Sequence, residues 1–234
     1  VFGTAQVGYQ DKVFLDLTAR NDWASTLAYT SHEKSGFFYP SAGLSFLIDK
    51  WIQLPEWISF AKLRGTYSKV GNDIPQFITN SVSHITAGGE LQANDAAPFK
   101  EMEPEMTHSV EVGTEWRFFQ SRLGFNLTYY RTNTHNQFFK LPALAGDMYA
   151  YRYVNAGDIQ NRGWELTVDA TPVLTPDFTW KTSLNFSSNR NKIKELHEEL
   201  KELVYGPSSF SSSYAMKLVK GGSIGDIYGL SLIH

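Results

Sequence analysis

The sequence predicts an all-β protein whose antiparallel strands form a segment of a transmembrane β-barrel. The first observation is that apolar and polar residues alternate along eight segments, which is typical of strands with two different faces. Each segment has 9 to 12 residues, close to the roughly 9–11 that a tilted strand needs to cross a bilayer. The segments span residues 1–9, 13–22, 37–48, 60–70, 107–118, 121–132, 162–171 and 178–189.

The second observation is the spacing of these segments. Counted to a weak ninth strand near residue 215, the gaps that follow them are 3, 14, 11, 36, 2, 29, 6 and 25 residues long. Every odd-numbered gap is shorter than every even-numbered one. Outer-membrane barrels alternate short periplasmic turns with longer external loops. The spacing therefore predicts short turns at one end of the sheet and long external loops at the other.

The third observation concerns the composition of the two faces. Residues such as Val112, Trp116, Phe125 and Trp180 share the apolar face, which carries only three charges at its external end, Lys69, Arg131 and Arg162. The opposite face, which we expect to line the barrel lumen, carries twelve charges: Asp16, Arg20, Asp22, Lys62, Arg64, Glu111, Glu115, Arg117, Arg122, Glu165, Asp169 and Lys181. We expect them to neutralise one another across strands, with Lys62 and Arg64 opposite Glu115, and Asp169 beside Lys181.

Aromatic residues favour the membrane over a soluble β-sandwich, which would show the same alternation. They gather at the ends with short turns, as an interfacial girdle does: Trp51, Trp57, Phe60, Trp116, Phe118, Phe119, Phe178 and Trp180. Two stretches are not predicted as strands. Residues 49–59 are expected to form a short interfacial turn of helix. Apolar residues at helical spacing predict an amphipathic helix in an external loop: Ile193, Leu196, Leu200 and Leu203.

Composition excludes several functional classes. The net charge of −3 does not suggest a surface that binds nucleic acid. The absence of cysteine excludes a disulfide scaffold, a Cys-ligated zinc site and a thiol nucleophile. None of the motifs GxGxxG, GxxxxGK[ST], HExxH or GxSxG occurs. The six histidines are scattered. We therefore expect no enzyme, no cofactor and no metal site.

Binding is expected in the two longest external loops, residues 71–106 and 133–161, because long loops on a rigid scaffold usually carry it. The second loop mixes tyrosines with charged residues, which suits stacking on sugar rings or on peptide side chains; a self-packed loop is the alternative. The candidate contacts to a substrate or to a lid protein are Asn72, Asp73, Asp147, Tyr149, Tyr151 and Arg152.

Several strings, in the same order along most of the chain, resemble the SusC/RagA family of TonB-dependent outer-membrane transporters. They are LTARNDWASTL (residues 17–27), YPSAGLSF (39–46), LRGTYSKVGND (63–73), THSVEVGTEWRFFQSRLGFNLTYYRTNTHNQ (107–137), VNAGDIQNRGWELTVDATPV (154–173), NFSSNRNKIKEL (185–196) and GGSIGDIYG (221–229). The tail LSLIH after Gly229 departs from the family pattern.

The resemblance implies a barrel of 22 strands whose lumen is closed by a plug. Outer-membrane transporters with this number of strands have a plugged lumen. Residues 1–234 would then supply eight or nine strands from the C-terminal half of one barrel domain, with the plug outside this chain. It further implies import of oligosaccharide or peptide fragments across the outer membrane of a Gram-negative cell. A SusD-like surface lipoprotein would serve as the lid, and the TonB complex would act through the plug.

Two alternatives remain open at the level of sequence. One is a small closed barrel of 8 to 10 strands with a pore or structural role. The other is a secreted β-sandwich that binds carbohydrate.

Overall fold

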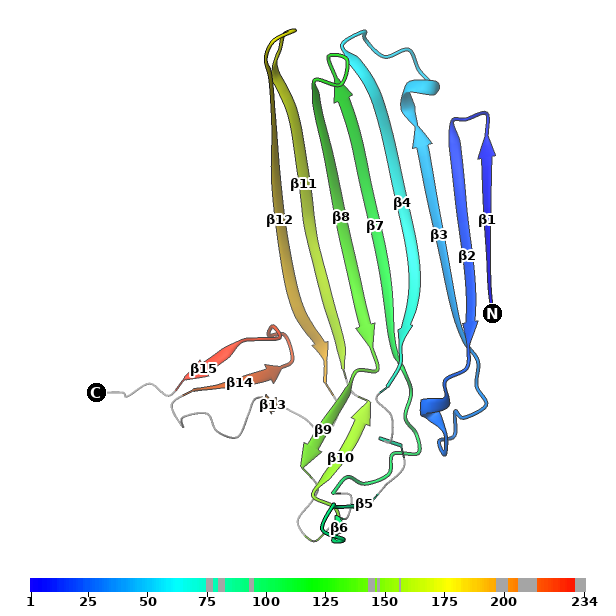
Figure 1. The fold of residues 1–234 in the computed structure, drawn as a ribbon, viewed down its shortest axis with the longest axis vertical. Coiled ribbons are helices and arrows are strands. Elements are labelled where there is room, and N and C mark those ends of the chain that lie inside the picture. The colour runs from blue at the N-terminus through cyan, green and yellow to red at the C-terminus, as the bar shows by residue number, and fades with distance from the viewer. Residues whose placement is uncertain are drawn as a thin grey trace, which may run out of the picture.

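Eight long strands form one antiparallel sheet in a computed structural model (Figure 1), in the order β1-β2-β3-β4-β7-β8-β11-β12. The structure describes residues 1–74, 78–79, 83–92, 95–142, 146, 148–155, 157–196, 202–205 and 214–229. The strands of the sheet are β1 (Phe2–Tyr9), β2 (Val13–Asp22), β3 (Phe37–Leu47), β4 (Ile58–Asn72), β7 (Glu105–Phe118), β8 (Leu123–His135), β11 (Asp158–Leu174) and β12 (Thr179–Glu195).

These strands confirm the eight segments predicted from the alternation. The largest difference is in β11 and β12, which are 17 residues long each and continue past the predicted ends. They continue because the two strands stay paired there, with Arg162 opposite Arg190 and Ile159 opposite Ile193. A buried apolar pair extends a ladder beyond the point where the alternation of the sequence fades.

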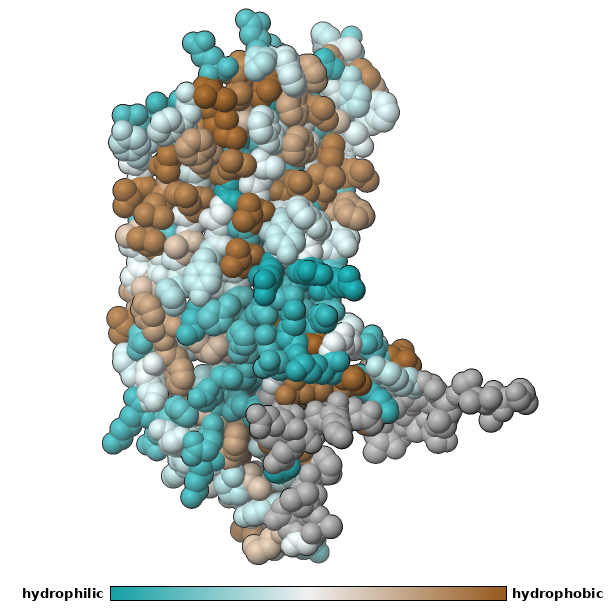
Figure 2. All heavy atoms as spheres, turned by 180° about the vertical axis from the view of Figure 1, so that it is seen from behind, coloured by the Kyte–Doolittle hydropathy of each residue, from teal (hydrophilic) through white to brown (hydrophobic). Residues whose placement is uncertain are grey.

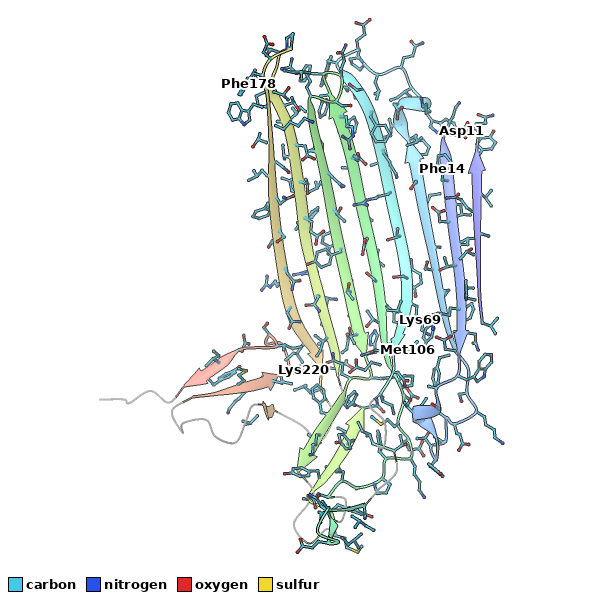
Figure 3. All side chains as sticks on the ribbon, viewed as in Figure 1. Asp11, Phe14, Lys69, Met106, Phe178 and Lys220 are labelled. Atoms are coloured by element: carbon cyan, nitrogen blue, oxygen red, sulfur yellow. The ribbon has the colours of Figure 1, made fainter. Side chains whose placement is uncertain are left out.

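Short turns and long connections lie at opposite ends of the sheet, as predicted (Figure 1). The turn from β1 to β2 contains Gln10 and Asp11, whose φ angles are 51° and 52°, the backbone of a two-residue turn that follows the twist of a hairpin. Asp11 and Phe178 mark this end in Figure 3, while Lys69 and Met106 mark the other. The strands thus run between an end with short turns and an end with long connections.

The register places the apolar residues on one face and the charged residues on the other. Leu44 is opposite Leu15, and Leu127 is opposite Leu166 on the apolar face. Among the described residues no second layer covers this face (Figure 2), and Leu44 is 51% exposed and Leu184 66%. A soluble sandwich would bury these side chains, so the structure does not support that alternative.

The sheet is open. Strands β1 and β12 occupy its two edges and do not pair with each other. Closure into a barrel of eight strands requires that pairing, so the described residues do not form the small closed barrel that the sequence left possible.

Smaller sheets lie beyond the loop end: β5 (His84–Ile85) with β6 (Leu91–Gln92), β9 (Phe138–Pro142) with β10 (Tyr151–Asn155), and β13 (Glu202–Tyr205) with β14 (Tyr214–Val219) and β15 (Ile227–Gly229). The strand expected near residue 215 is β14. Its partners in the described residues are β13 and β15, and it does not extend the eight-stranded sheet.

Helix is almost absent from the described residues. The predicted turn of helix after β3 is present as η2 (Ile48–Lys50). The amphipathic helix predicted from Ile193 to Leu203 is wrong where the structure describes it, because Ile193 belongs to β12 and Leu203 to β13; residues 197–201 lie outside the described residues. Ile193 packs on Ile159 and Leu218 instead. Within the described ranges, no helix has the length and hydrophobicity needed to cross a membrane.

Candidate functional site

The long connections at the loop end pack together instead of remaining open. Their centre is an apolar cluster of Leu27, Ile74 and Met102, all buried. Leu27 ends the one-turn helix η1 (Ser25–Leu27) between β2 and β3, while Ile74 and Met102 come from the connection between β4 and β7. Phe138 at the start of β9 packs against the same cluster. Three connections that are distant in sequence therefore share one small core, and we call this unit the loop platform.

Polar contacts fasten the loop platform. The side chain of Asn155 accepts a hydrogen bond from the backbone N–H of Glu103 (2.8 Å) and donates to the carbonyl oxygens of Glu103 and Asn136 (2.8 Å each). Asn136 Nδ2 in turn donates to the Glu103 carboxylate at 2.6 Å. His32 Nε2 lies 3.6 Å from the other carboxylate oxygen of Glu103. Glu103 thus joins all three connections.

A second fastening lies between η1 and the end of β4. The hydroxyl of Thr26 donates to the carboxylate of Asp73, which also accepts the backbone N–H of Ile74 at 2.9 Å. Thr79 Oγ1 donates to the carbonyl oxygen of Ala28 at 2.9 Å. Asp73 therefore fixes the direction in which the chain leaves β4.

An open hollow of about 450 Å³ lies beside the loop platform, at the loop end of β2 and β3. This volume falls in the range of small-molecule sites. We call it the outer hollow; its lining includes Arg20, Asp22, Trp23, Phe37, Tyr39 and Asp73. Arg20 Nε and Asp22 Oδ2 form an ion pair of 2.6 Å, and Trp23 is 60% exposed. The hollow thus combines flat aromatic surface with charged hydrogen-bonding groups.

Gly71 is required for the wall of the outer hollow. A Cβ at this position would overlap the hydroxyl and ring of Tyr39. The glycine therefore lets the Tyr39 ring lie against β4.

The predicted contact residues fall into two groups. Asn72 and Asp73 lie at the end of β4, where Asn72 Nδ2 donates to Glu105 at 3.4 Å and Asp73 lines the outer hollow. The others belong to the second loop: Tyr149, Tyr151 and Arg152 lie in or just before β10, and Asp147 lies outside the described residues. In that hairpin the Lys140 ammonium sits 3.9 Å from the Tyr151 ring centroid.

Several residues of this region were not predicted as contacts. Trp23 and Tyr39 are the aromatic walls of the outer hollow, and Glu103 and Asn155 fasten the loop platform. One signal was available for Trp23, since a tryptophan just after a predicted strand end is well placed for binding. No sequence pattern links Glu103 to Asn155, because that contact depends on how two loops meet.

On the charged face, the predicted seam between β4 and β7 is confirmed, and Lys62 is directly opposite Glu115. The expected neutralisation across strands differs in detail. Glu115 pairs with Arg117 of its own strand at 2.7 Å, and no ion pair among the described residues joins β4 to β7.

Arg64 faces Gly113 instead of Glu115, and Asp169 faces Ser183, which lies two residues from Lys181 along β12. Arg117 lies two residues from Glu115 along β7, so both side chains are on the same face of the sheet. Its guanidinium therefore reaches the Glu115 carboxylate more easily than the flexible Lys62 side chain does.

In the ranges that the structure describes, no three His, Cys, Asp or Glu side chains gather closely enough to hold a metal ion.

The fold defines a class of protein: an open antiparallel sheet of long strands, with one uncovered apolar face and packed loops at one end, is a section of a large outer-membrane barrel. Residues 1–206 match the family described as TonB dependent receptor-like, beta-barrel. The chain therefore belongs to the TonB-dependent receptor family of Gram-negative outer-membrane proteins.

Individual relatives agree with this family. The chain is 30% identical over 205 residues to TonB-dependent receptor P26 of Formosa agariphila, covering 83% of this chain and 20% of the relative. It is 24% identical over 210 residues to TonB-dependent receptor SusC of Bacteroides thetaiotaomicron, covering 83% of this chain and 20% of SusC. The chain thus spans about a fifth of the length of these relatives.

A solved structure shows the same fold. The RagAB peptide importer in its open-open state superposes with a TM-score of 0.78 at 22% identity, over 95% of this chain and 24% of the importer chain. The expected resemblance to SusC/RagA proteins is therefore confirmed, and the family is one of receptors and transporters.

Proposed function

We propose that this chain forms part of the wall and the outer mouth of a transporter that imports oligosaccharide or peptide fragments. The observation that carries the proposal is the loop platform, which is fastened to one end of the sheet beside the outer hollow. Import would be driven by the TonB complex through a plug domain outside this chain. A SusD-like lipoprotein would cover the mouth. The relatedness to SusC and to the RagAB peptide importer supports both the cargo class and the partner.

The two faces of the sheet have separate roles in this proposal. The apolar face contacts lipid, because exposed side chains such as Val112 and Leu184 would otherwise meet water. The charged face lines the lumen, with Lys62, Arg64, Glu111, Glu115, Arg117, Glu165, Asp169 and Lys181 among its residues. Its twelve charges are six acidic and six basic. A lining with equal numbers of acidic and basic residues favours neither cations nor anions, and it suits bulky cargo of low net charge.

The outer hollow supplies a contact for such cargo. Trp23 and Tyr39 offer flat apolar surfaces for a sugar ring or a peptide side chain, while Arg20, Asp22 and Asp73 offer hydrogen bonds to hydroxyl or amide groups. Replacing Trp23 with alanine removes one such surface. The apparent KM for import should rise about 2- to 12-fold, as expected for about 0.5–1.5 kcal/mol of aromatic contact.

The control for Trp23→Ala is Trp51→Ala, which removes an exposed tryptophan from the opposite, short-turn end of the sheet. Uptake of labelled oligosaccharides and peptides by cells expressing the full-length protein measures both variants. An unchanged KM for every cargo in Trp23→Ala, or an equal loss in Trp51→Ala, would reject the outer hollow as a contact site.

The hairpin of β9 and β10 is the proposed contact to the lid lipoprotein, because it projects beyond the loop end of the sheet, next to β5 and β6 (Figure 1). Deleting residues 147–153, which include Tyr149, Tyr151 and Arg152, should impair uptake or co-purification of the lipoprotein while the barrel still folds. Normal uptake together with normal complex formation would contradict this role.

A further inference from the structure

Three arginines lie side by side on the apolar face of the sheet. Arg162 of β11 is directly opposite Arg131 of β8 on one side and Arg190 of β12 on the other. The register therefore brings three guanidinium groups from three strands into one lateral row, which we call the arginine row. All three residues are exposed. Hydrophilic side chains gather in this region, below the apolar band, in Figure 2.

Like charges placed directly opposite one another destabilise a sheet. In the described residues, no carboxylate forms an ion pair with any member of the arginine row. Arg131 has only neutral partners: its Nε donates to Asn133 Oδ1 at 3.2 Å, and its Nη2 lies 2.9 Å from the side-chain amide of Gln160. The acidic residue that shares this face of β11, Asp158, is contacted by Asn133 at 3.0 Å and lies four residues from Arg162.

The depth of the arginine row matches a membrane boundary. Arg131 follows Leu123 by eight residues, about 26 Å along the strand at about 3.3 Å per residue, and the apolar band of a barrel is about 25 Å tall. Directly inside the row, Tyr129 and Trp164 pack with ring centroids 4.8 Å apart. Aromatic residues of this kind mark the interface with lipid headgroups. The arginines thus lie one step outside that interface, on the side of the long loops.

The row continues outward with further positive charge. Lys192 is opposite Gln160, and Lys69 is opposite His108, in the next row on the same face. The described residues offer this local excess of cations no ion-paired carboxylate. Because the groups border an apolar surface, an anion carried by a membrane lipid is well placed to balance it.

We propose that the arginine row binds phosphate groups on the headgroup of an anionic outer-leaflet lipid. Arginine is suited to this ligand, because its planar guanidinium donates two parallel hydrogen bonds to a phosphate. Three guanidiniums abreast can engage one headgroup that carries more than one phosphate, while its acyl chains lie on the apolar band below. The inference rests on the lipid-facing role of the apolar face, and it concerns lipid binding instead of cargo or lid.

The test measures binding of lipid A that carries two phosphates to the purified full-length protein in detergent. Native mass spectrometry and the thermal midpoint as a function of lipid concentration report the binding. Neutralising the row with Arg131→Gln, Arg162→Gln and Arg190→Gln together should weaken binding roughly a hundredfold, about fivefold per arginine. Lipid A without phosphates should bind the wild type as weakly as it binds the triple variant.

The matched control neutralises three cations of the opposite face, Arg117→Gln, Arg122→Gln and Lys181→Gln, and should leave lipid binding within about twofold of the wild type. If the triple variant fails to fold, Arg162→Gln alone should weaken binding about fivefold, and Arg162→Lys, which keeps the charge but loses the paired donors, should restore only part of it. Uptake of cargo is measured in parallel, so that a loss of transport is distinguished from a loss of lipid.

Three results would overturn the proposal. The first is equal binding of phosphorylated lipid A to the wild type and the triple variant. The second is competition by free inorganic phosphate at the same concentration as the lipid, which would assign the row to a soluble anion. Binding of the row to the lid lipoprotein, detected as loss of complex formation in the triple variant with unchanged lipid binding, would also contradict it.

Discussion

Arg64 on β4 donates a hydrogen bond of 2.7 Å to Thr128 on β8, although a whole strand, β7, lies between them. The contact passes over Gly113 of β7, where an added Cβ would lie 2.6 Å from Arg64 Nε and 3.2 Å from Thr128 Oγ1. A single glycine thus allows a side chain to join strands that are not neighbours. The hydrogen bond to Thr128 thus fixes the Arg64 guanidinium on the charged face without a carboxylate partner among the described residues.

Gly113→Ala should displace the Arg64 side chain and remove this bond. We expect a loss of about 1 kcal/mol in the free energy of unfolding, the usual worth of one hydrogen bond. Urea unfolding of the full-length protein in lipid vesicles measures it.

Thr128→Val removes the same bond without adding a Cβ over β7, and so completes a double-mutant cycle. The double variant should be scarcely less stable than either single one, because both changes remove one interaction. Fully additive losses would show that the bond contributes nothing.

Leu127→Arg should cost about 2–4 kcal/mol of barrel stability. Leu127 lies midway along β8 between Leu123 and Arg131 and is opposite Leu166 on the apolar face. The matched control is Asn126→Arg, which places the same group one residue away on the charged face. Folding yield into vesicles and the urea midpoint compare the two. An equal cost for both variants would contradict the assignment of the two faces.

Asn155→Ala should loosen the loop platform without unfolding the sheet. The substitution removes three hydrogen bonds to Glu103 and Asn136 and leaves part-buried backbone groups without these partners, at up to about 1–3 kcal/mol for each such group. Hydrogen exchange should accelerate in residues 100–104 and 136–155 but not in β7 or β8. Asn72→Ala, which loses one bond of 3.4 Å, is the control. Unchanged hydrogen exchange in the loop platform would show that Asn155 does not hold the platform together.

Gly163→Ala should destabilise the sheet between β11 and β12. A Cβ there would overlap the backbone oxygen of Ser188 and the phenol of Tyr130, and overpacking of this kind costs about 1–3 kcal/mol. Gly65→Ala is the matched control, because the nearest heavy atom to its Cβ is 4.0 Å away. Both are compared by urea unfolding of the full-length protein. Equal stability of the two variants would show that β11 and β12 can separate around the added Cβ without a measurable cost.

The alternation of the sequence predicted the long strands well because the membrane imposes one chemistry on each face. Outside the membrane that constraint ends. Ile193 and Leu203 therefore suggested a helix by their spacing, whereas pairing of Ile193 with Ile159 determines a strand. The fastening of Glu103 to Asn155 was also unpredictable, since it joins residues 52 apart through loops whose meeting depends on the finished barrel.

Single cysteines introduced along β8 distinguish the lipid-facing side of the sheet from its lumen-facing side. The chain contains no cysteine of its own. In the full-length protein, cleared of other cysteines and folded into vesicles, each residue from Gly124 to Tyr130 is replaced in turn and labelled with a fluorophore. Labels at Phe125, Leu127 and Tyr129 should be quenched by lipid-soluble quenchers, and labels at Asn126, Thr128 and Tyr130 by water-soluble ones. A uniform response along the strand, or the opposite alternation, would contradict the account.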